Sequence, residues 1–276
     1  MLKTRILTAA ILIVFFLSAL FYFPSIFWGI LLLALTVTAA HEWCKLGNFT
    51  TRQSILYLII TTLLGGELLL WLSEVVVHTP NHSGMLWLYA LSCLFWVIAA
   101  PILLATAQPI KRPSLLMFSG WLVLLPTCMA LYQLRAIDPW LLLGLMSVVW
   151  ISDSAAYFTG RAFGKHKLAP SISPGKTWEG VAGALVAVFC YALIWGLMAD
   201  KAYGFSVIGL ILLSLILTAL GIVGDLFESL MKRHAGVKDS GNILPGHGGI
   251  LDRIDALTST LPVAILVFLI INSLEL

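Results

Sequence analysis

The sequence predicts an all-α protein, a polytopic membrane helical bundle of about nine transmembrane helices. Of its 276 residues, 60% are hydrophobic and only 11% are charged, whereas soluble domains are about 45–50% apolar and about 25% charged. The mean hydropathy is +1.00. Apolar runs of about 20 residues, the length that crosses a bilayer core, recur along the whole chain. These observations exclude a soluble globular enzyme, a disordered protein and a secreted disulfide scaffold.

Nine apolar runs follow one another, and a helix is expected over each because charges, Pro, Gly or Asn bound every run. They cover residues 5–23, 24–40, 55–77, 85–106, 115–134, 139–159, 179–198, 205–224 and 256–273. At about 1.5 Å per residue, most can cross a hydrocarbon core of about 30 Å. Phe23-Pro24-Ser25 predicts a tight hairpin between the first two runs. The first run lacks an A-x-A cleavage site and is long for a signal peptide, so we expect a retained signal anchor.

The basic residues predict the orientation. All but two of the 16 Lys and Arg residues fall at the N-terminus or after an even-numbered run, and the exceptions are Arg135 and Lys201. The positive-inside rule then places the N-terminus in the cytoplasm and the C-terminus outside. The basic residues form short clusters between apolar runs, as expected beside anionic lipid, and no basic face indicates a nucleic-acid partner. The four cysteines form no CxxC or Cys/His cluster, so zinc is not expected.

Polar residues gather in the second half of the chain. We therefore divide it into an N-terminal transmembrane region, residues 1–134, with about five helices, and a C-terminal region, residues 135–276. The C-terminal region carries two polar segments, 152–180 and 225–255, which we expect to form mainly cytoplasmic loops around residues 160–178 and 225–255. Transporters usually place such groups near the midplane of the membrane. Here they fall at one membrane face.

The first polar segment combines an acid in an apolar run with a lysine before a helix. An ionised Asp153 inside the bilayer costs about 2.5–3.5 kcal/mol, so it needs a partner or a metal. Ser173, Lys176 and Thr177 lie just before the seventh run, an arrangement that suits a phosphate at a helix N-terminus. The segment is not a Walker A loop, because the G-x-x-x-x-G-K-[ST] spacing fails. The alternative, an ordinary capped turn with surface lysines, stays open.

The second polar segment is denser. If the eighth helix continues past Gly224, four polar side chains share one of its faces: Asp225, Ser229, Lys232 and Arg233. Asp252 and Asp255 lie at i, i+3 at the start of the last helix, so their carboxylates can converge. Asp225 ends the eighth run and Asp252 precedes the ninth, so the two helix ends would bring these aspartates together. Glycines at 246, 248 and 249 let a ligand approach the backbone around His247.

Grouped carboxylates without cysteine favour Mg2+ over zinc. The cations and glycines beside the carboxylates of the second segment indicate a polyphosphate bridged to the metal. The alternative for this segment is a solvated loop whose charges pair with one another and with lipid headgroups.

A long pattern runs through the second segment: Ser229, Lys232, Arg233, Lys238, Asp239, Gly241, Pro245, His247, Gly248, Gly249, Asp252, Arg253 and Asp255. This pattern resembles the signature of a known family, the bacterial type of phosphatidate cytidylyltransferase, also called CDP-diacylglycerol synthase. The stretch from Asp153 to Gly180 is similar to the family's second recurrent segment, so the likeness spans about residues 150 to 262. The N-terminal half matches only as a hydrophobic multi-span region.

The resemblance implies the reaction CTP + phosphatidic acid → CDP-diacylglycerol + pyrophosphate in the bacterial inner membrane, where the charge distribution would make the C-terminus periplasmic. It implies Mg2+ as cofactor, with a monovalent cation such as K+ as a further candidate, and a homodimer. We expect the catalytic site at the cytoplasmic face, built from Asp225, Ser229, Lys232, Arg233, Lys238, Asp239, His247, Asp252, Arg253 and Asp255. The expected metal ligands are Asp225 and Asp252, followed by Asp255 and Asp153. The expected phosphate-binding residues are Ser173, Lys176, Thr177, Lys232, Arg233, Lys238 and Arg253.

Two alternatives remain at this stage. One is another Mg-dependent lipid phosphotransferase, although the Asp-Gly-x2-Ala-Arg motif of the CDP-alcohol phosphotransferases is absent. The other is an ion-coupled membrane transporter that uses Asp153, Glu67 or Asp225 as ion sites. Glu67 in the third apolar run favours the transporter, but a packed, protonated carboxyl explains it equally.

Overall fold

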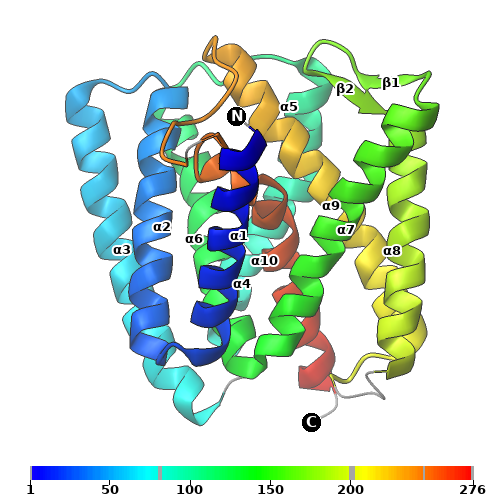
Figure 1. Ribbon diagram of the computed structural model, residues 1–276. Coiled ribbons are helices and arrows are strands. Elements are labelled where there is room, and N and C mark those ends of the chain that lie inside the picture. The colour runs from blue at the N-terminus through cyan, green and yellow to red at the C-terminus, as the bar shows by residue number, and fades with distance from the viewer. Residues whose placement is uncertain (1, 80–82, 199–202, 245, 275–276) are drawn as a thin grey trace.

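The computed structural model of the protein describes residues 2–79, 83–198, 203–244 and 246–274. It is a bundle of long helices with one small β-hairpin (Figure 1). The helices are α1 (Leu2–Tyr22), α2 (Ser25–Leu46), α3 (Thr51–His78), α4 (Leu86–Leu94), α5 (Ala100–Thr106), α6 (Pro113–Ile137), α7 (Pro139–Phe163), α8 (Trp178–Met198), α9 (Val207–His234) and α10 (Leu251–Leu274). Two short turns, η1 (Ser83–Met85) and η2 (Phe95–Ala99), flank α4, and the strands are β1 (Lys167–Ala169) and β2 (Ser173–Thr177).

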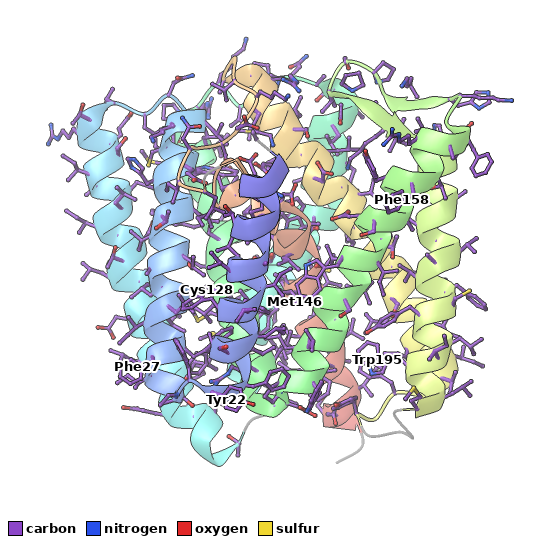
Figure 2. The ribbon with its side chains drawn as sticks, viewed as in Figure 1. Tyr22, Phe27, Cys128, Met146, Phe158 and Trp195 are labelled. Carbon is purple, nitrogen blue, oxygen red and sulfur yellow. The ribbon has the colours of Figure 1, made fainter. Side chains whose placement is uncertain are left out.

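The predicted membrane bundle is confirmed. Eight helical segments of the described chain are long and apolar enough to cross a membrane, with η1, α4, η2 and α5 together forming one of them. α1 corresponds to the first apolar run, and its apolar stretch Ala10–Tyr22 is shorter. Figure 2 shows apolar side chains such as Phe27 and Phe158 projecting outward, while Cys128 and Met146 lie inside. The protein is therefore a polytopic membrane helical protein.

The fourth span is continuous but locally widened. At η2, residues 95–99, the helix is of the π type, and the Ala100 N–H donates to the Phe95 carbonyl five residues earlier. Pro101 follows directly and has no N–H to donate, and its ring needs room in the preceding turn. A wider turn satisfies both requirements, so the span continues past the proline without ending.

The loops alternate between the two ends of the bundle. The α2–α3, α5–α6 and α9–α10 connections and the β-hairpin all lie at one end, the upper end in Figure 1. We call this the polar end, because it carries Lys45, Arg52, Lys111 and Arg112 together with both polar segments. α10 runs through the middle of the bundle, packed against α9, α6 and α4. The first turns of α10 therefore lie inside the bundle and toward the polar end (Figure 1).

At the opposite end, Arg135 fastens the hairpin between α1 and α2. Its guanidinium donates hydrogen bonds to the carbonyls of Leu20 (2.7 Å) and Phe23, and it lies 5.1 Å from the ring centroid of Trp28. This basic residue therefore satisfies the free carbonyls at the C-terminus of α1. Lys201, the other basic residue assigned to this side, lies outside the described residues.

Both polar segments contain more regular structure than the loops predicted from the sequence. α9 continues to His234 and α10 begins at Leu251, so only residues 235–250 form the connection that was expected over 225–255. The last turn of α9 carries Lys232, Arg233 and His234, which the negative end of the helix dipole favours.

The other expected loop, 160–178, contains an antiparallel hairpin in which Lys167 pairs with Thr177. It is held at its base by Glu179, whose carboxylate accepts from the His166 backbone N–H and lies 2.7 Å from its ring nitrogen Nδ1. The four cysteines form no disulfide among the described residues.

Candidate active site

A cavity of about 660 Å³ opens at the polar end, and both predicted polar segments supply its walls. We call it the main cavity. Helices α7, α8, α9 and α10 and both strands of the hairpin contribute to it. It is lined by Ser152, Asp153, Ala156, Tyr157, Gly160, Arg161, Lys167, Leu168, Ser173, Gly175, Lys176, Thr177, Gly180, Val181, Ile222, Asp225, Asp252 and Asp255.

The four expected metal ligands all line this cavity: Asp153 on α7, Asp225 on α9, and Asp252 and Asp255 on α10. Glycine at 224 allows the last two helices to meet. A Cβ there would lie 2.5 Å from Ser259 Oγ and 2.7 Å from the Asp255 carbonyl oxygen. The α9 backbone therefore contacts α10, which brings Asp225 within electrostatic range of Asp255.

Lys176 reaches the carboxylates from the hairpin. Its ammonium lies 2.6 Å from Asp225 Oδ2, and both side chains are partly open to the cavity. Thr177, its neighbour on β2, is buried, and its hydroxyl accepts the Gly180 N–H at 3.1 Å. Thr177 is thus the N-cap of α8. In the segment from Ser173 to Thr177, Lys176 is the charged residue that lines the cavity, and Ser173 also lines its wall.

Asp252 is tied into a buried network. Its Oδ1 lies 2.7 Å from Lys232 Nζ, and its Oδ2 accepts from the Ser240 N–H (2.9 Å), the Ser240 hydroxyl (2.9 Å) and the Gly249 N–H (2.8 Å). Lys232 also lies 3.3 Å from Glu228, a buried acid outside the family-like pattern. Asp252 therefore holds the α9–α10 connection in addition to facing the cavity.

The remaining candidates do not line the main cavity. Ser229 donates to Asp225 Oδ1 at 3.3 Å. Arg233 donates to the carbonyls of Ile172 (3.2 Å) and Val237 (3.4 Å), and Arg253 donates to the His247 carbonyl (2.9 Å). Lys238 and Asp239 are exposed on the α9–α10 connection. The two arginines therefore bind backbone carbonyls and fasten loops, while Pro245 lies outside the described residues.

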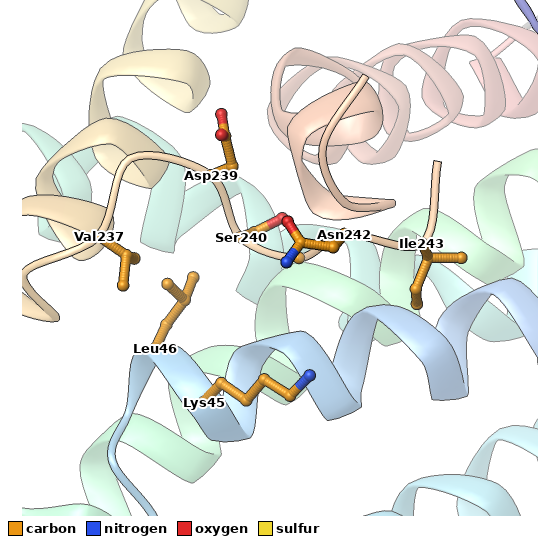
Figure 3. A pocket seen from close by; sticks show the side chains of 8 residues that line it. Lys45, Leu46, Val237, Asp239, Ser240, Asn242 and Ile243 are labelled. Atoms are coloured by element: carbon orange, nitrogen blue, oxygen red, sulfur yellow. The ribbon is translucent and has the colours of Figure 1, made fainter. Parts of the chain in front are cut away.

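A second cavity, of about 420 Å³, lies between the end of α2 and the α9–α10 connection (Figure 3). Lys45 and Leu46 form one side, and Val237, Asp239, Ser240, Gly241, Asn242 and Ile243 form the other. Ser240 therefore stands between the two cavities, because it lines this one and donates to Asp252 in the main one.

The aspartates of the main cavity have the ligand atoms that a hard cation prefers. They offer only carboxylate oxygens, which suit Mg2+ better than zinc. Within the described ranges, no three His, Cys, Asp or Glu side chains converge into a ligand set. Lys176 and Lys232 instead neutralise Asp225 and Asp252. A divalent cation bound by Asp225 or Asp252 would have to displace these lysines from the carboxylates.

Sequence reasoning missed three residues around the site. Arg161 and Lys167 line the main cavity. Both are basic residues of the first polar segment, which could have indicated a role in the site, but none was assigned to them. Glu42 is completely buried near the end of α2 and bonds to the α9–α10 connection. Its signal was an acid two residues after the end of the second apolar run. Glu67, in contrast, lies on the exposed outer face of α3 and lines neither cavity.

Comparison with known proteins agrees with this architecture. The chain is 37% identical to the phosphatidate cytidylyltransferase of Haemophilus influenzae, over 95% of this chain and 96% of that protein. It is 36% identical to the protein of the same name from Pseudomonas aeruginosa, over 95% of both chains. A 115-residue stretch, 42% of both chains, is 52% identical to the phosphatidate cytidylyltransferase of Bacillus subtilis. Residues 3–271 match the cytidylyltransferase family, and the chain belongs to this family.

Proposed function

We propose that this chain transfers the cytidylyl group of CTP to phosphatidic acid, forming CDP-diacylglycerol and pyrophosphate in phospholipid biosynthesis. The observation that carries the proposal is the main cavity, which four aspartates and Lys176 line at one end of a membrane bundle. One substrate is a water-soluble polyanion and the other is an anionic lipid. A charged cavity at the edge of a membrane bundle gives both of them access.

In the proposed reaction, an oxygen of the phosphatidate phosphate attacks the α-phosphorus of CTP. The new P–O bond forms as the bond from the α-phosphorus to the oxygen bridging the β-phosphorus breaks, and pyrophosphate leaves. A phosphate monoester is already ionised near neutral pH, so the step needs little help from a general base. Positioning and charge neutralisation are therefore the main contributions expected of the protein.

Lysines and arginines are the proposed phosphate ligands. Lys176 and Lys232 each hold a carboxylate in the structure, and we propose that they exchange it for substrate phosphate. Lys238 is exposed and can approach a soluble polyphosphate. The other proposed contributors are Ser173, Thr177, Arg233 and Arg253, with His247 as a hydrogen-bond donor rather than a base.

We propose Mg2+ as the cofactor, with Asp225, Asp252, Asp255 and Asp153 as its candidate ligands. Asp153, Asp225 and Asp255 come from three different helices and face one cavity, whereas both oxygens of Asp252 already accept hydrogen bonds. When bound, the cation supplies positive charge to the phosphates and the leaving group. A requirement for a monovalent cation such as K+ can be tested in the turnover assay described below, by replacing K+ with a large organic cation.

We propose that the polar end faces the cytoplasm of a bacterial cell, with the C-terminus in the periplasm. The basic clusters at this end support that orientation under the positive-inside rule. It also places the main cavity where CTP is supplied. A homodimer remains a prediction from the family resemblance.

The test is a turnover assay with the purified protein in detergent. Radiolabelled CTP, phosphatidic acid and Mg2+ are expected to yield lipid-soluble label and pyrophosphate without any ion gradient, and dCTP is expected to replace CTP. Asp225→Asn is the inactive control, since it removes a carboxylate from the cavity and keeps the shape of the side chain. Comparable turnover with ATP, or no lipid-soluble label from the folded protein, would contradict the proposal.

A further inference from the structure

Glu42 connects the N-terminal helices to the α9–α10 connection. It lies near the end of α2, and none of its surface is exposed. Its Oε1 accepts the Ile250 N–H at 3.0 Å, and its Oε2 accepts the Leu251 N–H at 2.9 Å. None of the ion pairs found in the described parts of the chain includes Glu42. Its partners are therefore backbone and hydroxyl groups.

These contacts cap the N-terminus of α10. The first N–H groups of a helix have no partner within the helix, and the helix dipole favours a negative charge beside them. An N-cap is usually Ser, Thr, Asp or Asn directly before the helix. Ile250 holds that position here and has no side-chain acceptor. Glu42 supplies the missing acceptor from a helix 208 positions away in the sequence.

Two glycines of the α9–α10 connection make room for this carboxylate. A Cβ at Gly249 would lie 2.4 Å from Glu42 Oε1 and 2.5 Å from Oε2. A Cβ at Gly241 would lie 2.4 Å from Oε1. From the sequence, Gly249 was expected to let a ligand approach the backbone. The structure shows that the group approaching it is the side chain of Glu42.

Ser240 extends the contact to the main cavity. Its hydroxyl lies 3.1 Å from Glu42 Oε2 and 2.9 Å from Asp252 Oδ2. A serine hydroxyl has one hydrogen, so it donates to one of these carboxylates at a time. The Ser240 N–H also donates to Asp252 Oδ2. A shift of Glu42 therefore changes both the backbone at the start of α10 and a direct partner of Asp252.

We propose that Glu42 is a positioning residue for the cytidylyl transfer. It caps α10 and holds Ser240, and through both it orients Asp252 and Asp255 in the main cavity. The inference rests on the proposed function. It assigns a role in the reaction to the second helix, which carries none of the site residues predicted from the sequence.

The first experiment compares Glu42→Gln with Glu67→Gln as a matched control. The Glu42→Gln substitution keeps the size of the side chain but turns an NH2 group toward one of the N–H donors of α10. Glu67 is exposed on α3, and its replacement removes a carboxylate without touching the site. Removing a partner that orients metal-site ligands typically lowers activity or metal affinity about 10–100-fold. We expect kcat of the Glu42→Gln variant to fall by about this factor and its Mg2+ requirement to rise, with KM for CTP within about twofold of wild type.

A second pair of variants tests the same contact from the other side. Gly249→Ala places a methyl group against the Glu42 carboxylate. The new Cβ would also lie 2.3 Å from Ser240 Oγ, but this hydroxyl can rotate away. We expect kcat to fall at least about tenfold in this variant. In the Glu42→Ala background the carboxylate is gone, so adding Gly249→Ala is expected to cost much less. Such non-additivity measures the contact directly.

The outcomes separate the inference from the proposed function. All rates are normalised to folded protein, with thermal unfolding recorded for each variant. If the wild-type protein forms no CDP-diacylglycerol, the proposed function fails and the role of Glu42 in it fails as well. If wild type is active and Glu42→Gln matches Glu67→Gln, or if the loss follows only the folded fraction, the inference alone is overturned. Additive effects of Glu42→Ala and Gly249→Ala overturn it too.

Discussion

Replacing Asp225 and Asp252 by Asn is expected to affect stability very differently. Only 7% of the Asp252 side chain is exposed, and its partner Lys232 is 12% exposed. The Asp252→Asn substitution removes the charge that pairs with Lys232. The new NH2 group also has to face either Lys232 or the N–H groups of Ser240 and Gly249, which are all donors. Asp225 and Lys176 are more open to the cavity, with 30% and 24% of their side chains exposed.

The magnitudes follow from this difference in burial. Removing one partner of a buried ion pair costs about 3–5 kcal/mol. Lys232 keeps Glu228 at 3.3 Å, so we expect the lower end for Asp252→Asn, about 3 kcal/mol. At roughly 2–4 °C per kcal/mol this lowers the melting temperature by about 6–12 °C. A solvent-open pair contributes about 0–1 kcal/mol, so Asp225→Asn is expected to shift the melting temperature by at most about 4 °C.

The assay is thermal unfolding of the purified variants in one detergent, combined with CTP-dependent turnover. Both variants are expected to lose most activity, but only Asp252→Asn is expected to lose stability. Glu67→Gln controls for removal of a carboxylate elsewhere. Equal melting temperatures for the Asp225 and Asp252 variants, or a less stable Asp225 variant, would refute the assignment of Asp252 to a buried structural network.

Three further predictions concern single residues. Lys176→Met is expected to lower kcat/KM about tenfold to a hundredfold, the equivalent of one charged hydrogen bond of about 1.5–3 kcal/mol, and unchanged kinetics for both substrates would contradict a phosphate-binding role. Arg135→Ala removes the hydrogen bonds to Leu20 and Phe23, so we expect about 2–4 kcal/mol of lost stability in an unfolding measurement with kcat per folded protein unchanged. A Lys165→Cys variant, changed at an exposed position, is expected to react with an impermeant reagent only from the cytoplasmic side, and labelling from outside intact cells would reverse the proposed orientation.

Hydropathy and charge by themselves determined the membrane fold. A long apolar run must form internal backbone hydrogen bonds in lipid, and a helix is the only open-ended structure that does so. The nine runs therefore predicted the helical segments without knowledge of their packing. The same argument marked Asp153 as unusual, because a carboxylate in an apolar run needs a reason to be there. Asp153 lines the main cavity.

Tertiary structure decided what each polar residue contacts. Arg233 and Arg253 look like phosphate ligands in the sequence, yet they bind backbone carbonyls in the structure. Thr177 caps α8, and Asp252 holds the connection that precedes α10. Glu42 lies 208 positions from Ile250 along the chain, and no local pattern links them. Hydropathy is a property of neighbours in sequence, whereas these bonds depend on how separate helices pack, so only the folded bundle could show them.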